Sequence, residues 1–316
     1  MAVRQLSEEQ NLSAVAAAWN TALPRDCLTE KRFRAVMLGD PNYEPEGMMV
    51  AKDDDGSVLG FAACVLRRTV EGKDGGGRDG EFPWAFLKGF FVVEGEEGEA
   101  AADGLLAAVE SYAAAAGKEL MRVTEYSAGY VYPGMDVHYE RLCEALSARG
   151  YRDVRTIEDV GVDLRQPELP ALLERARKRA GPGVEMLTWR PELLPAMRDF
   201  VAEGDQAQWF PVGWEKRFSQ PRERALVLKR GSEIVGWAEY WPGRPQAGFG
   251  PTLVLERERG KGYGSFLLRE CMLRARDGGA QYMDAGWANT GFYTRNGWRV
   301  VRRYAVFTKE LHAGAR

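Results

Sequence analysis

The stretch "RERGKGYGSFLLRECMLRA", residues 257–275, places three glycines, together with the bases Arg259 and Lys261, directly before an apolar run with helical spacing. Glycine costs a helix about 1 kcal/mol relative to alanine, so the three glycines must serve a tight turn or a close approach of the backbone to a ligand. The N–H groups at a helix start attract anions, and Arg259 and Lys261 add positive charge. The stretch therefore predicts a strand, a phosphate-binding turn and a helix; a solvated connection is the alternative.

The spacing of these glycines excludes two common phosphate-binding signatures. A P-loop requires GxxxxGK[ST], which the stretch lacks, and the dinucleotide fingerprint GxGxxG does not fit Gly260-x-Gly262-x-Gly264. The residues do match [QR]-x-x-G-x-[GA], through Arg259, Gly262 and Gly264. That pattern is the acyl-CoA pyrophosphate signature of the GNAT superfamily of N-acetyltransferases, which this segment resembles.

Two further features carry the same resemblance. Val254 lies where the family has an apolar residue of its fourth strand, and "NTGFYTRNGW" (289–298) is similar to a later family motif. Asn289 precedes Tyr293 by four residues, a closer spacing than in the family. The resemblance is specific over 226–308, and it implies an α/β fold (α+β mixed sheet) in which a central mixed sheet is flanked by helices.

The chain also contains the same order of elements twice, read as β-α-α-β-β-β-α-β-α-β in each half. Two unrelated α/β domains with similar hairpins are the alternative. Three pairs of positions align, at offsets of 176, 162 and 147 residues: Gly60 with Gly236, Leu106 with Leu268, and Gly150 with Gly297. We therefore expect two GNAT-like domains in tandem, an arrangement also found in mycothiol synthase. The expected boundaries are 1–164, a linker with a short basic helix at 165–182, and 183–316.

The first half lacks the signature of the second. At an offset of 162, the positions of Arg259, Gly262 and Gly264 are occupied by Glu97, Ala100 and Ala102, and at an offset of 147 the position of Tyr293 is Leu146. Carboxylates repel a pyrophosphate, and alanine lacks the backbone freedom of glycine. We therefore expect a degenerate first domain that shapes the protein or its substrate site and does not bind CoA.

Composition excludes several other classes of protein. The 316 residues carry 43 basic and 46 acidic side chains, a net charge of −3 that does not favour a nucleic-acid binder. No apolar run is long enough for a membrane span, and the four cysteines have neither zinc-site nor disulfide-framework spacing. The sequence has only two histidines, which argues against a histidine-based metal site and against hydrolysis by a Ser-His-Asp triad. We expect a cytoplasmic protein, monomeric or homodimeric, without a metal, nucleic-acid or membrane partner.

The resemblance implies acetyl transfer from acetyl-CoA, a cosubstrate, to a primary amine by direct attack. Tyr293 matches the general acid of the family, whereas by itself it could be a packing aromatic. For the general base, Glu239 lies on a strand among aromatic residues and Asp284 lies on the fifth strand; either could equally be a surface carboxylate. A non-catalytic acyl-CoA-binding sensor or assembly module is the rival reading, and a CoA-independent interaction protein is a third.

The acceptor could be a small amine, an antibiotic, a peptide terminus or a lysine, and a small-molecule amine is favoured over a protein. Aromatic walls suit an amphipathic or cationic amine. The candidate acceptor-binding residues are Trp209, Trp214, Trp237 and Trp241. Hydrophobic contacts between helices or domains are the alternative role for these aromatics. The candidate donor-binding residues are Leu253, Val254, Arg259, Gly260, Lys261, Gly262, Tyr263, Gly264, Ser265 and Asn289.

Overall fold

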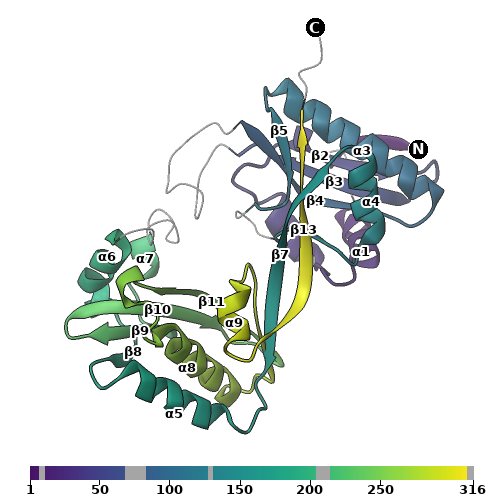
Figure 1. Cartoon of the computed structure of the whole chain (residues 1–316). Helices are drawn as coiled ribbons and strands as arrows, with labels where there is room; N and C mark the ends of the chain where they lie inside the picture. The colour runs from purple at the N-terminus through teal and green to yellow at the C-terminus, as the bar shows by residue number, and fades with distance from the viewer. Residues whose placement is uncertain (7–10, 68–82, 127–130, 204–213, 312–316) are drawn as a thin grey trace. The chain divides into compact units, whose positions relative to one another are not determined.

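The computed structural model describes residues 1–6, 11–67, 83–126, 131–203 and 214–311. They form two compact units, each with a mixed sheet and helices (Figure 1). The predicted α/β class is therefore confirmed. The first unit contains the described residues of Met1–Val70, Arg78–Ile157 and Arg303–Arg316, and the second contains those of Glu158–Arg302.

The first unit follows the element order that was expected for one half, with one additional short strand, β6. Its elements are β1 (Ala2–Gln5), α1 (Leu12–Ala22), α2 (Glu30–Met37), β2 (Met48–Lys52), β3 (Val58–Val65), β4 (Trp84–Val92), α3 (Glu96–Ala115), β5 (Leu120–Val123), β6 (Met135–Asp136) and α4 (Glu140–Ala148). Neighbouring strands pair in the order β1-β2-β3-β4-β5, and only β4 and β5 are parallel. The core surrounds Trp19, which packs on Phe33, Phe61 and Phe91.

The second unit repeats this order after one extra helix, α5. Its elements are α5 (Leu169–Ala180), β8 (Glu185–Trp189), α6 (Leu194–Ala202), α7 (Trp214–Arg217), β9 (Arg222–Arg230), β10 (Glu233–Trp241), β11 (Gln246–Val254), α8 (Tyr263–Asp277), β12 (Tyr282–Ala285) and α9 (Thr290–Thr294). The sheet order β8-β9-β10-β11-β12 mirrors that of the first unit, and again only the last pair is parallel. Helix α5 contributes Leu169 and Ala176 to the core of this unit, so the helix of the predicted linker is packed within the second unit.

The last strand of each half completes the sheet of the other half. Strand β7 (Arg152–Asp163) follows the first repeat, yet its residues from Val160 to Asp163 pair antiparallel with β12. Strand β13 (Arg299–Glu310) follows the second repeat, yet its residues from Thr308 to Glu310 pair antiparallel with β5, as the yellow strand of Figure 1 shows. Each compact unit therefore contains a segment from the other half, and the linear boundaries drawn from the sequence do not separate the units.

The register of the strands reproduces the repeat found in the sequence. Gly60 lies opposite Val92 in the first sheet, and Gly236 lies opposite Val254 in the second. The differences, 236 − 60 = 176 and 254 − 92 = 162, equal the offsets of the sequence alignment. Equivalent residues of the two units can therefore be compared directly. Within the part of the chain that the structure describes, no helix has the length and apolar character needed to cross a membrane.

Candidate active site

The turn before α8 requires glycine at two positions. Gly260 has φ = 82° and Gly262, the N-cap of α8, has φ = 91°, a left-handed conformation that strains other residues. The first backbone bond within the helix runs from the Phe266 amide to the Gly262 carbonyl, and no side chain of the described residues caps the helix. The amides of the first turn, at residues 263–265, are therefore the donors left at this helix end.

The third glycine allows α9 to approach α8. A Cβ atom added to Gly264 would lie 3.1 Å from Cε2 of Phe292 and 3.8 Å from Cγ2 of Val254. Phe292 is the neighbour of Tyr293 on α9, and their rings pack at 5.1 Å between centroids. The absence of a side chain at Gly264 thus allows three segments to pack together: the glycine turn, the end of β11, and the helix that carries Tyr293.

The basic residues of the turn have different environments. The Arg259 side chain is 59% exposed and makes a 3.6 Å ion pair with the exposed Glu256, a contact that contributes little in water. Lys261 Nζ instead donates at 2.8 Å to Glu258, a buried carboxylate that also receives Arg230. Burial raises the pKa of Glu258, but the hydrogen bond from Lys261 and the charge of Arg230 outweigh it and hold that pKa below its usual range. Lys261 therefore braces the turn and adds less unpaired positive charge than the sequence indicated.

Strands β11 and β12 pair over only three residues and then separate. Gly248 opposite Asp284 is the last paired rung, and β11 continues to Val254 without β12. Backbone N–H groups point alternately to the two sides of a strand. Because the Leu255 amide donates to β10, at the Val235 carbonyl, the amides of Val254 and Thr252 face the β12 side, and that of Leu253 faces β10. The geometry thus favours Val254 and adds Thr252, which the sequence reasoning missed.

Tyr293 lies beside this opening. Its ring packs on Phe249 of β11 at 6.1 Å between centroids and on Trp298 at 5.1 Å, and the residue is 7% exposed. Burial raises the pKa of the Tyr293 phenol above its ordinary value. The hydroxyl therefore stays protonated near neutral pH and can donate a proton or hydrogen bond. Asn289, the N-cap of α9, accepts the Phe292 and Tyr293 amides through its backbone carbonyl and so begins this helix.

The two candidate bases are in contrasting places. Glu239 is 1% exposed and accepts a 2.6 Å hydrogen bond from Arg222, so its carboxylate belongs to a buried ion pair. Asp284 is half-buried and lies on the last rung before β11 and β12 separate. No hydrogen bond or ion pair joins the Asp284 carboxylate to another side chain of the described residues. Asp284 is therefore the better placed of the two to accept a proton from a group entering the opening.

The candidate acceptor aromatics do not form one wall. Trp237 is 3% exposed and packs on Phe218, which favours the core alternative for this residue. Trp214 also packs on Phe218, at 5.5 Å between ring centroids. Trp241 is 46% exposed, and its indole N–H donates to the Gly250 carbonyl on β11 at 3.0 Å, so its ring lies close to the opening. Trp209 lies outside the described residues.

Strand β7 holds the loop that leads into α9, a contribution that no local motif indicated. Glu158 accepts a 2.7 Å hydrogen bond from the Thr290 hydroxyl through its side chain, and its carbonyl accepts the Ala288 amide. The neighbouring Asp159 carboxylate accepts the Trp287 amide at 3.3 Å. Trp287 has φ = 51°, an uncommon conformation for a bulky residue, which these contacts help to maintain. The first half of the chain thus fixes the position of Tyr293.

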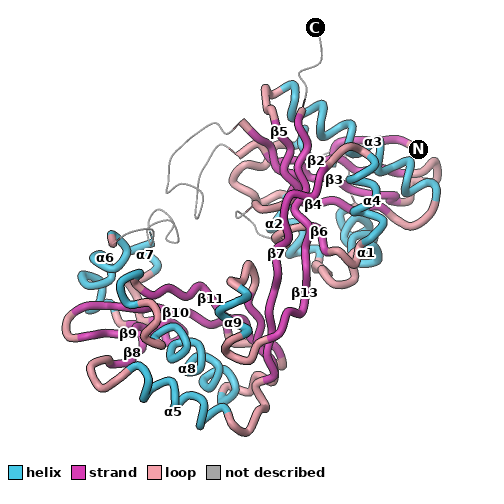
Figure 2. Tube along the Cα trace, in the orientation of Figure 1, coloured by secondary structure: helices cyan, strands magenta, loops and turns pink. Residues whose placement is uncertain are grey.

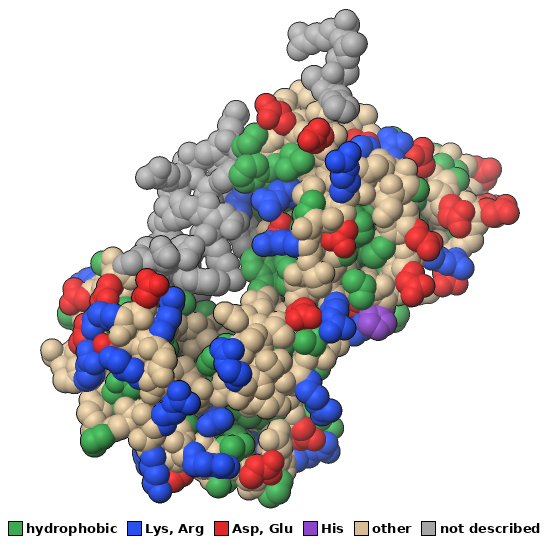
Figure 3. Space-filling model, in the orientation of Figure 1, with side chains coloured by type: hydrophobic (Ala, Val, Ile, Leu, Met, Phe, Trp, Pro, Cys, Tyr) green, Lys and Arg blue, Asp and Glu red, His purple; other side chains and the backbone are tan. Residues whose placement is uncertain are grey.

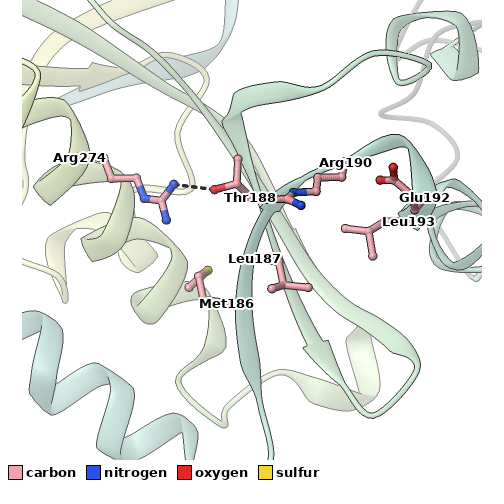
Figure 4. A pocket seen from close by; sticks show the side chains of 7 residues that line it. All are labelled: Met186, Leu187, Thr188, Arg190, Glu192, Leu193 and Arg274. Atoms are coloured by element: carbon pink, nitrogen blue, oxygen red, sulfur yellow. Dashed lines mark hydrogen bonds between the residues drawn. The ribbon is translucent and has the colours of Figure 1, made fainter.

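A hollow of about 560 Å³ lies elsewhere on the second unit, beside the edge strand β8 (Figure 4). It contains no candidate site residue, and Arg274 crosses it to donate to Thr188 Oγ1 at 2.8 Å. Its lining consists of Met186, Leu187, Thr188, Arg190, Glu192, Leu193 and Arg274. The opening beside β11, rather than this hollow, brings the candidate catalytic groups together.

Comparisons with known proteins address the family and the fold of the chain. Residues 185–298 match the model of the acetyltransferase (GNAT) family. No curated protein matches the chain. Among solved structures, a GCN5-related N-acetyltransferase from Sphaerobacter thermophilus is similar, with a TM-score of 0.66 and 17% identity over 99% of this chain and 96% of that one. A tandem GNAT protein of the clavulanic acid biosynthesis pathway has a TM-score of 0.65 and 15% identity, over 99% of this chain and 98% of its own.

A third structure is similar over part of its length. It is the GCN5-related glucosamine N-acetyltransferase region of a fungal multi-domain β-N-acetylglucosaminidase, with a TM-score of 0.74 and 15% identity. The match covers 98% of this chain and 38% of that protein. Residues 185–298 of this chain therefore belong to the GNAT family of acetyltransferases, and the chain as a whole has the fold of a tandem GNAT protein.

Proposed function

We propose that the protein is an acyl-CoA-dependent N-acyltransferase that transfers an acetyl group from acetyl-CoA to a primary amine at a single site in the second unit. The observation that carries the proposal is the meeting of three elements: the glycine turn of α8, the opening beside β11, and the buried phenol of Tyr293. A sensor would need the turn alone. The additional phenol and the carboxylate of Asp284 support an enzyme.

The turn fits the phosphate groups of the donor. Three amides at the start of α8 and the exposed guanidinium of Arg259 would hold the pyrophosphate, and the left-handed glycines let the backbone approach it. Acetyl-CoA would supply an activated acyl group as a thioester. The amides of Val254 and Thr252, which face the β12 side, would polarise the thioester carbonyl as an oxyanion hole does.

The chemistry then requires one base and one acid. The amine nitrogen attacks the carbonyl carbon, the C–N bond forms and the C–S bond breaks. Asp284 would take the proton that leaves the amine, and Tyr293 would give its proton to the departing sulfur. The two groups lie on neighbouring elements beside the same opening, which supports a direct attack without an acyl-enzyme.

The acceptor is proposed to be a small amine. The partly exposed ring of Trp241 lies beside the last rung of β11 and β12, where the amine would enter. An aromatic face attracts an ammonium group by a cation–π interaction.

Thiol release tests the proposal. The purified protein is incubated with acetyl-CoA and a panel of small amines, diamines, amino sugars and peptide amines, and free CoA is measured with a thiol reagent. We expect amine-dependent release that Asp284→Asn lowers strongly, whereas Glu239→Gln mainly lowers the melting temperature because it disturbs a buried ion pair. Tight acetyl-CoA binding without release for any amine would support the sensor instead.

A further inference from the structure

Helix α5 packs antiparallel to α8, although it precedes the residues that match the family model. Arg269 on α8 donates to the Leu172 carbonyl on α5 at 3.1 Å. A second contact joins Arg179 of α5 to Gly262 at the start of α8. Arg179 lies seven residues after Leu172, whereas Gly262 lies seven residues before Arg269. The two contacts run in opposite directions along the helices, so the last turn of α5 lies beside the first turn of α8 (Figure 2).

Arg179 lies across the glycine turn. Its Cγ and Cδ atoms lie 3.0 Å from the position that a Cβ atom would occupy on Gly262, and Nη2 donates to the Gly260 carbonyl at 3.3 Å. This hydrogen bond uses one of the five guanidinium N–H donors. The side chain is exposed, so the remaining donors are accessible beside the unpaired amides of α8.

Two further guanidinium groups lie near Arg179. Arg175 is one turn earlier on the same face of α5, and the charges of Arg175 and Arg179 add to burial in lowering the pKa of Arg269. In the described parts of the chain, no carboxylate forms an ion pair with any of these three arginines, and the buried Nε of Arg269 has no hydrogen-bond partner. Figure 3 shows many Lys and Arg side chains over this part of the second unit. Such crowding of like charges is unfavourable unless an anion lies among them.

We propose that α5 is part of the donor site, and that Arg179, together with Arg175, binds phosphate groups of acyl-CoA. The inference rests on the proposed function, because it assumes that the turn holds the donor. A guanidinium group can donate two parallel hydrogen bonds to two oxygens of one phosphate, and it remains charged at every relevant pH. The segment between the two repeats, which the sequence presented as a linker, thereby supplies ligand-binding residues from outside the matched GNAT domain.

Basic residues in the last turn of a helix also stabilise that helix through its dipole. Arg177 lies in the same turn of α5 and is exposed, but it makes no contact with the glycine turn among the described residues. Substitution of Arg177 therefore reproduces the loss of helix-end charge and leaves the proposed phosphate contact intact.

Calorimetric titration of the whole chain with CoA and with 3′-dephospho-CoA tests the proposal. Relative to the wild type, Arg175→Ala/Arg179→Ala should weaken CoA binding by about ten- to a hundredfold, whereas Arg177→Ala should change it by less than about twofold. Equal weakening for both ligands would place the contact on the pyrophosphate, and weakening for CoA alone would place it on the 3′-phosphate; both results support the proposal. Wild-type affinity in the double variant, with an unchanged melting temperature, would overturn it while leaving the proposed function intact. A wild-type protein that binds neither ligand would overturn both.

Discussion

The two units have the same strand order and register, but they differ at the start of the helix that follows the fourth strand. Helix α8 begins at Tyr263, whose equivalent is residue 101, whereas α3 begins five residues earlier at Glu96. At 1.5 Å per residue, the start of the helix is displaced by about 7.5 Å. The first turn of α3 carries Glu96, Glu97 and Glu99, whose negative charges compensate the dipole of that helix. The first unit therefore retains the helix but lacks an anion-binding turn.

The openings beside the fourth strands also differ. In the first unit the Tyr132 hydroxyl accepts the Phe90 amide at 3.3 Å, and Phe90 is equivalent to Thr252. Lys88, equivalent to Gly250, is buried and paired with Asp40. The amide that would polarise a carbonyl in the second unit is thus satisfied internally in the first. The comparison shows that the apolar pattern preserves the fold in both units, whereas one turn and one strand differ between them; we propose that these differences restrict donor binding to the second unit.

The largest predicted effect concerns the independence of the two halves. Fragments 1–164 and 165–316 each lose a strand that completes their sheet. The first fragment also loses Tyr304 and Phe307 from its core, and burial of two aromatic side chains contributes about 3–6 kcal/mol. That is a large share of the ~5–15 kcal/mol that stabilises a domain. We expect neither fragment alone to show a cooperative melting transition by circular dichroism, and co-expression to recover a folded complex. Two stable, independent fragments would show that the exchange of β7 and β13 between the two sheets is not required for folding.

Sequence reasoning could identify the repeat because glycine positions and apolar alternation are local properties. It could not foresee the exchange of β7 and β13, since a strand with a given pattern pairs equally well with either of two similar partner edges. Likewise, the glycine turn was predicted from its residues. Arg179 was not, because its contact with Gly262 depends on how α5 packs rather than on any motif.

The second prediction compares one phenol from each unit. Tyr293→Phe should lower kcat by about a hundred- to ten-thousandfold, as expected for loss of a general acid, with little change in KM for acetyl-CoA. Tyr132→Phe removes a buried hydroxyl from the first unit and should cost about 1 kcal/mol of stability while leaving kcat unchanged. Burial raises the pKa of Tyr293, so its phenol should stay protonated as the pH rises to about 10. The kcat of the wild type should therefore show no decrease from deprotonation of Tyr293 over that range. Near-normal turnover of Tyr293→Phe would make this residue a packing aromatic.

The third prediction concerns the glycine turn. Arg259→Glu/Gly262→Val should weaken acetyl-CoA binding by at least about a hundredfold, because it reverses a charge and places a side chain at a left-handed position. Gly231→Val introduces similar backbone strain at φ = 62° in the turn between β9 and β10, and should leave binding unchanged. Titration of the wild type should give one site per chain. Two sites of similar affinity would show that the first unit binds the donor despite its acidic helix end.

The smallest predicted effect tests whether β7 positions the catalytic loop. Thr290→Val removes the hydroxyl that donates to Glu158 at 2.7 Å and preserves the shape of the side chain. A hydrogen bond to a charged group contributes about 1.5–3 kcal/mol, so a loop held less firmly should lower kcat by roughly tenfold while KM for acetyl-CoA stays nearly constant.

Thr294 provides a matched control on the same short helix, since its hydroxyl donates only to the Thr290 carbonyl among the described residues. Thr294→Val should therefore retain kcat, and Thr290→Ser, which restores the donor, should recover most of the lost rate. If Thr290→Val and Thr294→Val had equal rates, β7 would complete the sheet without positioning Tyr293. A selective loss in Thr290→Val would instead show that the first half of the chain contributes to catalysis in the second unit, although its own equivalent site lacks the glycine turn and has Leu146 at the position of Tyr293.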